Sequence, residues 1–186
     1  MKIMICGLTG TGKSTIAKAI AEAMNYEYLP SSVLFREFAG IDKKTAGFWT
    51  HKEGQEFIEE RLKSDIDEQF DKYLLDLIDK KDNFVIDSWT MPWLYKEPCL
   101  KIYLKCPFSV RINRVMLRDK LNEEDAKNAV KKKDQDTRKI YLQKYFFDIF
   151  KDIEDFDLVL NTQYFDAKGA ILYVLNYVKT VEKYYK

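Results

Sequence analysis

The sequence predicts an α/β fold in which a central parallel sheet of five strands carries helices on both faces. Short apolar runs alternate along the chain with longer segments whose apolar residues recur every three or four positions. This alternation is typical of β-α-β units, which make the strands parallel and cover both faces of the sheet. The chain has 186 residues, 46% of them hydrophobic, and no Pro-, Gly- or Ser-rich linker, so we expect a single domain over residues 1–186.

Five short apolar runs are expected to be the strands. The first run stops at Gly7 and the third at Asp87, which predicts that these two residues lie at the carboxyl ends of their strands. The runs are Ile3–Cys6, Tyr26–Leu29, Phe84–Ile86, Leu100–Leu104 and Asp157–Leu160.

Helices are expected between and after these runs. The first follows Ser14, and the apolar residues between Glu53 and Asp79 fit one long helix or two consecutive ones. The region from Pro107 to about Asp148 is strongly helical with an interruption near Asp119–Asp125, which is typical of a mobile lid. The closing helix carries an apolar stripe from Ile171 to Val181.

Scarce residues exclude several classes of protein. His51 is the single histidine, which excludes multi-histidine metal sites, and no nucleophile motif lies near it to form a hydrolase triad. The three cysteines, Cys6, Cys99 and Cys106, are an odd number without C-x-x-C spacing. This argues against a disulfide framework or a zinc knuckle and indicates a reducing compartment.

Charge and hydropathy indicate a cytoplasmic protein without a membrane partner. No uncharged stretch exceeds ten residues, as in Gly169–Val178, which is half of what a membrane span needs, and no signal peptide is visible. The net charge of +1 offers no evidence for nucleic acid binding. Eleven acidic and five basic residues lie in 53–82, whereas twelve basic and six acidic residues lie in 101–139, which suits a small polyanion held at one place. The oligomeric state stays open.

The segment from Gly7 to Ser14 matches the phosphate-binding pattern of Gly, four residues, Gly-Lys-Ser/Thr. It lies between a predicted strand and a predicted helix, where backbone N–H groups and the helix N-terminus surround phosphate oxygens. Lys13 would reach the β and γ phosphates of ATP, and Ser14 would bind Mg²⁺. A structural glycine turn is the alternative. The expected ATP-binding residues are Gly7, Thr9, Gly10, Thr11, Gly12, Lys13, Ser14 and Thr15.

The motif predicts the three-layer α/β/α fold of the P-loop NTPases. Asp87, at the end of its strand, would hold Mg²⁺ through water and face the substrate, although a turn aspartate is the competing interpretation. The sequence Asn-Lys-x-Asp, which reads guanine, does not occur, so a GTPase is disfavoured.

Four segments in combination make the chain similar to the archaeal cytidylate kinase-like family of nucleoside monophosphate kinases. The resemblance covers most of the chain and implies a helical, acceptor-binding insert over about residues 31–80 and a lid over about residues 107–140. The segments are GLTGTGKST (7–15), LFREFA (34–39), VRINR (110–114) and FDLVLNT (156–162).

The resemblance implies roles for several arginines. Arg36 would hold the acceptor monophosphate, unless it is a surface arginine paired with a glutamate. Arg114 would lie at the transferring phosphoryl group as a catalytic residue. Arg111 and Arg118 share its helix face and would bind substrate, although a row of arginines is more often a solvated face.

Further roles come from the last third of the chain. Lys133 and Arg138 would be catalytic, at positions where the family carries basic residues. Asn161 and Thr162, after the last strand, would border the adenine of ATP, with a simple turn as the alternative.

The chain departs from the family pattern at Trp89. Cytidylate kinases carry an acidic-Gly-Arg sequence here, whereas this chain has Asp87-Ser88-Trp89. An indole cannot donate a charged bidentate contact to phosphate, but it can stack on a base or close the acceptor pocket. Lys133 likewise stands where an arginine is expected.

The predicted function is transfer of the γ-phosphoryl group of ATP, with Mg²⁺, to CMP, dCMP or a similar small acceptor. Two alternatives remain open. One is another small-molecule P-loop kinase, and the other is an ATP-binding regulatory or assembly protein with weak turnover, prompted by the missing arginine.

Overall fold

A computed structural model describes residues 1–41, 48–50 and 52–184. In this part of the chain five parallel strands form one sheet in the order β2-β3-β1-β4-β5, and the expected fold class is confirmed. His51 lies outside the described residues. The strands are β1 (Lys2–Gly7), β2 (Glu27–Pro30), β3 (Phe84–Asp87), β4 (Leu100–Lys105) and β5 (Leu158–Asn161), each within one residue of the expected limits.

Helices connect the strands and cover the sheet. The segment expected to hold one or two helices holds two, α3 and α4, and the interruption in the basic region separates α6 from α7. The short helix α5 was not expected, whereas α2 lies within the helical insert that the resemblance implies. The helices are α1 (Lys13–Met24), α2 (Ser31–Phe38), the 3₁₀ turn η1 (Phe48–Thr50), α3 (Lys52–Arg61), α4 (Ile66–Asp79), α5 (Met91–Leu94), α6 (Phe108–Asp119), α7 (Glu123–Tyr145) and α8 (Ala167–Tyr184).

The break between α6 and α7 has a local cause. Lys120 takes a left-handed conformation (φ 55°) at the end of α6, which stops the helix. Asn122 then caps α7, because its side-chain oxygen accepts a hydrogen bond from the N–H of Asp125 at 2.9 Å. Three acidic residues in the first turn of α7 add a favourable interaction with the helix dipole.

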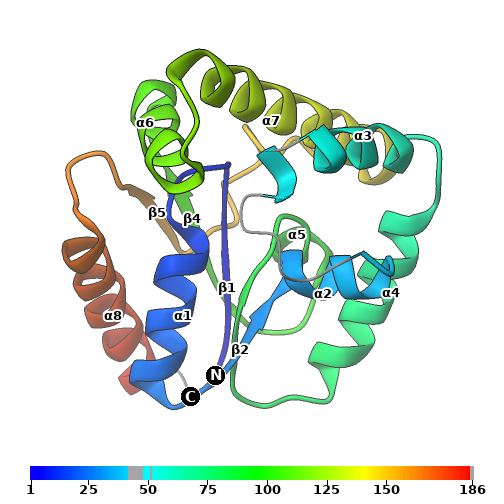
Figure 1. The fold of residues 1–186 in the computed structure, drawn as a ribbon. Coiled ribbons are helices and arrows are strands. Elements are labelled where there is room, and N and C mark those ends of the chain that lie inside the picture. Colours follow the sequence, from blue (N-terminus) through cyan, green and yellow to red (C-terminus); the bar gives the residue numbers. More distant parts are fainter. Residues whose placement is uncertain (42–47, 51, 185–186) are drawn as a thin grey trace.

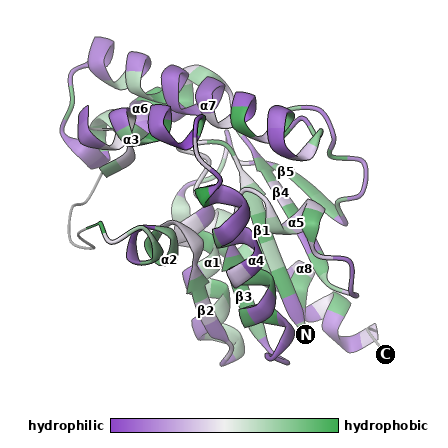
Figure 2. Cartoon of the chain, turned by 90° about the vertical axis from the view of Figure 1, so that its right-hand side faces the viewer, coloured by the Kyte–Doolittle hydropathy of each residue, from purple (hydrophilic) through white to green (hydrophobic). Residues whose placement is uncertain are grey.

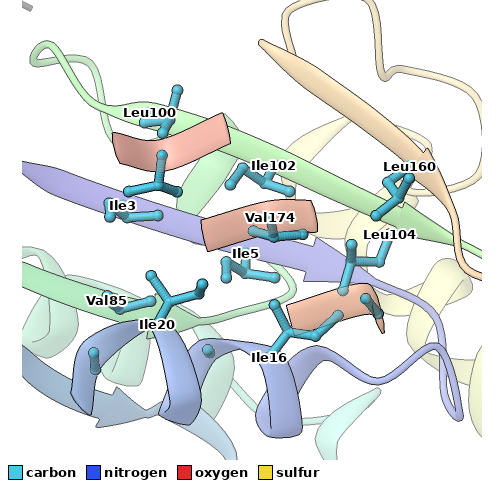
Figure 3. Close-up of a cluster of buried hydrophobic side chains, with 14 residues drawn as sticks. Ile3, Ile5, Ile16, Ile20, Val85, Leu100, Ile102, Leu104, Leu160 and Val174 are labelled. Carbon is cyan, nitrogen blue, oxygen red and sulfur yellow. The ribbon is translucent and has the colours of Figure 1, made fainter. Parts of the chain in front are cut away.

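The sheet separates two hydrophobic clusters because residues along β1 alternate between its faces. Ile3 and Ile5 point to the side covered by α1 and α8, where Ile20 and Val174 pack against them (Figure 3). Met4 points to the opposite side, into the cluster formed with α2, α4 and α5. Figure 1 shows these two helical layers on either side of the strands.

The carboxyl edge of the sheet lies beneath a third group of helices. The phosphate-binding segment leaves β1 at this edge, and the register of the parallel strands sets Ile5 beside Asp87. Helices α3, α6 and α7 lie above the edge (Figure 1) and are mostly hydrophilic, in contrast to the strands (Figure 2). Ligands of open parallel sheets bind at this edge, so it is where a site is expected. No described helix is long and apolar enough to cross a membrane.

Candidate active site

The phosphate-binding loop is built from backbone that only glycine accommodates easily. Gly10 and Gly12 have φ values of 81° and 98°, in the region that disfavours side chains. A Cβ on Gly10 would lie 2.9 Å from the carbonyl oxygen of Arg111, and one on Gly7 would lie 2.2 Å from that of Leu104. Helix α1 begins directly after Gly12 without a side-chain cap, which leaves its first N–H groups directed at the loop.

Lys13 is the cation at the centre of the loop. Its ammonium group donates a hydrogen bond to the carbonyl oxygen of Leu8 at 3.2 Å and lies 5.0 Å from the ring centre of Trp89. Burial lowers the pKa of this ammonium group below its usual value. The lysine is therefore held where a phosphate in the loop would meet it.

Ser14 and Asp87 form the predicted metal-binding pair. The Ser14 hydroxyl donates a hydrogen bond to Oδ2 of Asp87, and burial raises the pKa of this carboxyl group. Within the described residues, Oδ1 of Asp87 is buried and has no hydrogen-bond partner. A buried oxygen without a partner beside a hydroxyl fits a hard cation such as Mg²⁺, which prefers oxygen ligands and keeps several waters.

The phosphate-binding loop borders an outer cavity of about 460 Å³. One wall is the loop and the start of α1, including Thr15, and the other comes from α6 and the segment after β5. Arg114 fixes this second wall, because its guanidinium donates to the hydroxyl of Thr162 at 3.0 Å and to its carbonyl oxygen at 2.8 Å. Arg118 and Thr162 line the cavity as well, as the sequence predicts for a nucleotide-binding site.

A central cavity of about 240 Å³ adjoins the outer one. The two share Gly10, Lys13, Ser14 and Arg118. The remaining lining residues of the central cavity are Thr9, Ser31, Ser32, Arg36, Phe48, Trp49, Asp87, Trp89 and Lys133. Six basic or metal-binding side chains expected from the sequence thus converge here from α1, α2, β3, α6 and α7.

An inner cavity of about 60 Å³ continues from the central one, with which it shares Trp89 and Lys133. Its floor is polar: the guanidinium of Arg61 donates to both oxygens of Asp67, at 3.1 and 2.5 Å, and both residues are buried. Asp71 accepts hydrogen bonds from Thr90 at 2.7 Å and Tyr145 at 2.6 Å, and burial raises its pKa to about 6. Aromatic walls complete the cavity, formed by Phe35, Trp49, Phe70, Trp89 and Tyr141.

Arg111 contacts the loop rather than a cavity. Its guanidinium donates to the carbonyl oxygen of Thr9 at 2.9 Å and to Asp134 at 2.5 Å, and it is buried. Asp134, on α7, also accepts a hydrogen bond from the N–H of Thr9 at 3.2 Å. Arg111 and Asp134 therefore join α6 and α7 to the phosphate-binding loop, and a substrate contact of Arg111 stays a prediction.

Two other predicted residues lie away from the three cavities. Arg138 forms a bidentate ion pair with Asp148, at 2.8 and 2.5 Å, on another side of α7. Asn161 accepts a hydrogen bond from the N–H of Gln163 at 3.1 Å, an arrangement typical of a turn. Their catalytic and adenine-binding roles stay predictions.

Sequence reasoning missed the residues of the inner cavity. Arg61, Asp67 and Asp71 lie in an acidic stretch that reads as a solvated helix face. One signal was available: Asp67, Asp71 and Leu74 recur at the spacing of the apolar stripe of α4, so the two carboxylates share its buried face. Paired carboxylates on a buried face indicate a site rather than a surface.

The chain resembles known proteins in sequence. Residues 2–164 match the model of the cytidylate kinase-like family. A cytidylate kinase of Pyrobaculum islandicum is 34% identical, with 96% of this chain and 93% of that protein covered. A cytidylate kinase of Sulfolobus acidocaldarius is 33% identical, with 95% and 94% covered.

Solved structures agree in fold. An uncharacterized protein from Eubacterium ventriosum has a TM-score of 0.69 at 17% identity, with 96% of this chain and 99% of that chain covered. A shikimate kinase from Acinetobacter baumannii has a TM-score of 0.56 at 17% identity, with 96% and 93% covered. At such identities the likeness describes the fold alone.

Proposed function

The chain belongs to the cytidylate kinase-like family, and from that premise we propose that it transfers the γ-phosphoryl group of ATP to CMP or dCMP. As a nucleoside monophosphate kinase it is a phosphotransferase. One observation carries the choice of reaction: three cavities follow one another, and the central one holds Lys13, Arg36, Arg118 and Lys133. A donor and an acceptor that meet through their phosphates suit this arrangement.

The outer cavity would take ATP. Its β and γ phosphates would lie in the loop against the N-terminus of α1, and its base would lie between Arg114 and the segment that follows β5. Arg114 supports this placement, because its bonds to Thr162 hold together the two elements that would border the base.

Mg²⁺ would be held by Ser14 and Asp87, whose buried Oδ1 has no partner within the described residues. When bound, the ion would neutralise charge on the donor phosphates. The hydroxyl of Ser14 already donates to Asp87, so the two side chains are pre-oriented for this task.

The acceptor would span the central and inner cavities. Arg36 lines the central cavity and would bind the acceptor phosphate. The inner cavity combines carboxylates, a guanidinium and a hydroxyl between aromatic walls, and cytosine offers the matching groups. Its exocyclic amine would donate to a carboxylate such as Asp71, while its ring nitrogen and carbonyl would accept from the guanidinium of Arg61. Uracil would place a carbonyl against the carboxylate, which disfavours UMP.

The reaction needs no general base. An ionised oxygen of the acceptor phosphate forms a bond to the γ phosphorus, the bond from that phosphorus to the bridging oxygen breaks, and the β phosphate leaves with the electron pair. Lys13, Arg118 and Lys133, which line the central cavity, would stabilise the charge on the transferring group. Approach of α7 would exclude water and so limit hydrolysis of ATP.

The test is an acceptor panel assayed with the full chain, saturating ATP and Mg²⁺, following ADP formation. CMP and dCMP are expected to exceed UMP by about tenfold or more in kcat/KM, because a site that hydrogen-bonds an amine rejects the analogue without it. They are expected to exceed AMP and GMP as well, because a purine is larger than cytosine and the inner cavity is small. Turnover only with a nucleoside or a small organic acid would replace the proposal with another small-molecule kinase. ATP binding without acceptor-stimulated ADP formation would replace it with a regulatory role.

A further inference from the structure

Lys133 brings an ammonium group to two cavities without an ion pair to any described carboxylate. Its ammonium group has no hydrogen bond or ion pair with any other described residue, although it lines both the central and the inner cavity. It lies 5.3 Å from the ring centre of Trp49 and 5.8 Å from that of Trp89. Burial and the neighbouring Lys13 hold the pKa of this ammonium group well below its usual range. Two indole rings therefore lie beside the ammonium group of Lys133, where a paired carboxylate would be expected.

The Trp89 ring also lies close to a second ammonium group. Lys13, from α1, lies 5.0 Å from the centre of the same indole. Two like charges that approach one ring repel each other, and the negative face of the indole offsets part of that repulsion. Trp89 thus holds one cation from the phosphate-binding loop and one from the lid, and both line the central cavity.

The backbone around Trp89 is held in place. The N–H of Ser88 donates to the carbonyl oxygen of Ile5 at 3.1 Å, which continues the pairing of β3 with β1. The hydroxyl of Ser88 accepts from the N–H groups of Thr90 and Met91, each at 3.2 Å. The indole itself packs against the hydrophobic cluster that includes Ile58 of α3 and Tyr141 of α7. A ring supported on so many sides is a fixed platform for the two lysines.

We propose that Trp89 is a positioning residue, whose indole holds Lys13 and Lys133 over the central cavity before substrates bind. This inference rests on the proposed function, in which one phosphate arrives from each side and meets a cation already in place. Positioned cations lower the reorganisation needed in the transition state, so the indole acts on turnover through the lysines. The strength of the effect should follow the π face of the side chain at position 89, in the order Trp, Phe, Leu.

The first test observes the lysines without any ligand. Protons above an aromatic ring resonate upfield, so the Hε signals of Lys13 and Lys133 in ¹³C-lysine-labelled protein are expected upfield of those of exposed lysines. Lys13→Met and Lys133→Met assign them. In W89L the Lys13 signal should return to the ordinary position, and the Lys133 signal should keep only the part due to Trp49. A Lys13 signal that is ordinary in the unaltered protein, or that stays upfield in W89L, overturns the proposal.

The second test is kinetic and uses CMP and ATP. We expect kcat to fall about fivefold in W89F and about thirtyfold in W89L, with less than a threefold change in the KM for CMP, because cation–π contacts to two lysines are weakened and then lost. An unchanged kcat in W89L, or an effect confined to the KM for CMP, overturns positioning, and the second result would favour stacking on the base. Failure of the unaltered protein to phosphorylate CMP contradicts the proposed function, while the lysine signals still test the inference.

Trp93→Phe is the matched control. Trp93 stacks on Phe147 with ring centres 4.7 Å apart and lines none of the three cavities. Its replacement should alter neither the lysine signals nor kcat. W89F retains an aromatic ring at position 89, so its kcat still tests the proposal if W89L unfolds.

Discussion

The outer and inner cavities, at the two ends of the row, are formed by different parts of the chain. The outer cavity takes most of one wall from a continuous segment, 10–16, whose backbone is shaped by glycines and by the start of α1. The inner cavity gathers side chains from α2, α3, α4, α7 and the segment after β3. A few consecutive residues can thus form a phosphate-binding site, whereas a base-binding site needs side chains from several elements that only the complete fold brings together.

The difference predicts how each end responds to substitution. At the outer end, backbone N–H groups persist whatever side chains are changed, and Lys13, Arg114 and Arg118 supply the positively charged side chains. At the inner end, Arg61 is paired with Asp67, and Asp71 accepts from Thr90 and Tyr145, so removal of one partner leaves the other without compensation. Substitutions at the outer end should therefore affect chemistry, and those at the inner end should affect both stability and acceptor choice.

The largest effect is expected at Lys13. Lys13→Ala should lower kcat by about a thousandfold or more while the circular dichroism spectrum stays unchanged, because the main cation at the transferring group is lost. Lys18→Ala is the control on the same helix, where Lys18 forms an exposed pair with Glu22. Full activity in Lys13→Ala would contradict the role of the loop.

Arg61→Met tests the inner end. It removes the partner of the buried Asp67, so urea unfolding should report a loss of about 3–5 kcal/mol in the free energy of unfolding. Lys52→Met, in the exposed Lys52–Glu56 pair of the same helix, should cost less than about 1 kcal/mol. Equal losses in the free energy of unfolding of the two variants would contradict a buried Arg61–Asp67 pair at the floor of the inner cavity.

Asp71→Asn should change how stability depends on pH. Burial raises the pKa of the Asp71 carboxyl group from 3.8 to about 6. The folded state therefore binds more protons than the unfolded state between these values, and its free energy of unfolding falls as pH rises from about 4 to 6. The variant lacks this term, so relative to it the unaltered protein should lose up to about 3 kcal/mol across the window. Parallel stability curves would place the Asp71 carboxyl in a solvated environment.

The smallest effect is expected at Arg138. Its guanidinium side chain is 37% exposed and pairs with Asp148, so Arg138→Met should leave the free energy of unfolding nearly unchanged. Turnover should change less than about threefold, because the residue lines none of the three cavities. A loss of activity above tenfold would show that Arg138 joins the site during catalysis.

Local patterns were sufficient for the sheet and the phosphate-binding end. The continuous apolar run Ile3–Cys6 and the glycine spacing in the loop are properties of neighbouring residues, so they could be read directly from the chain. The break between α6 and α7 was likewise predictable, because Asn122 and the acidic residues after it form a helix start.

The inner end was not predictable from local pattern. Arg61 meets Asp67 across the turn between α3 and α4, and Thr90 reaches Asp71 across 19 residues of sequence. Trp89 was recognised as a departure from the family pattern, but its contact with Lys133 depends on where α7 crosses the sheet. Contacts of this kind depend on the tertiary fold, so the spacing of residues along the sequence does not predict them.

The link between Arg111, Asp134 and Thr9 also bears on how this enzyme can be engineered. The buried pair joins α6 to α7, and both residues hydrogen-bond the backbone of the loop. A chimaera that imports α7 from a relative without a carboxylate at position 134 would leave Arg111 as a buried charge without its partner. The two helices and the loop therefore form one exchangeable module, and recombination boundaries should lie outside it.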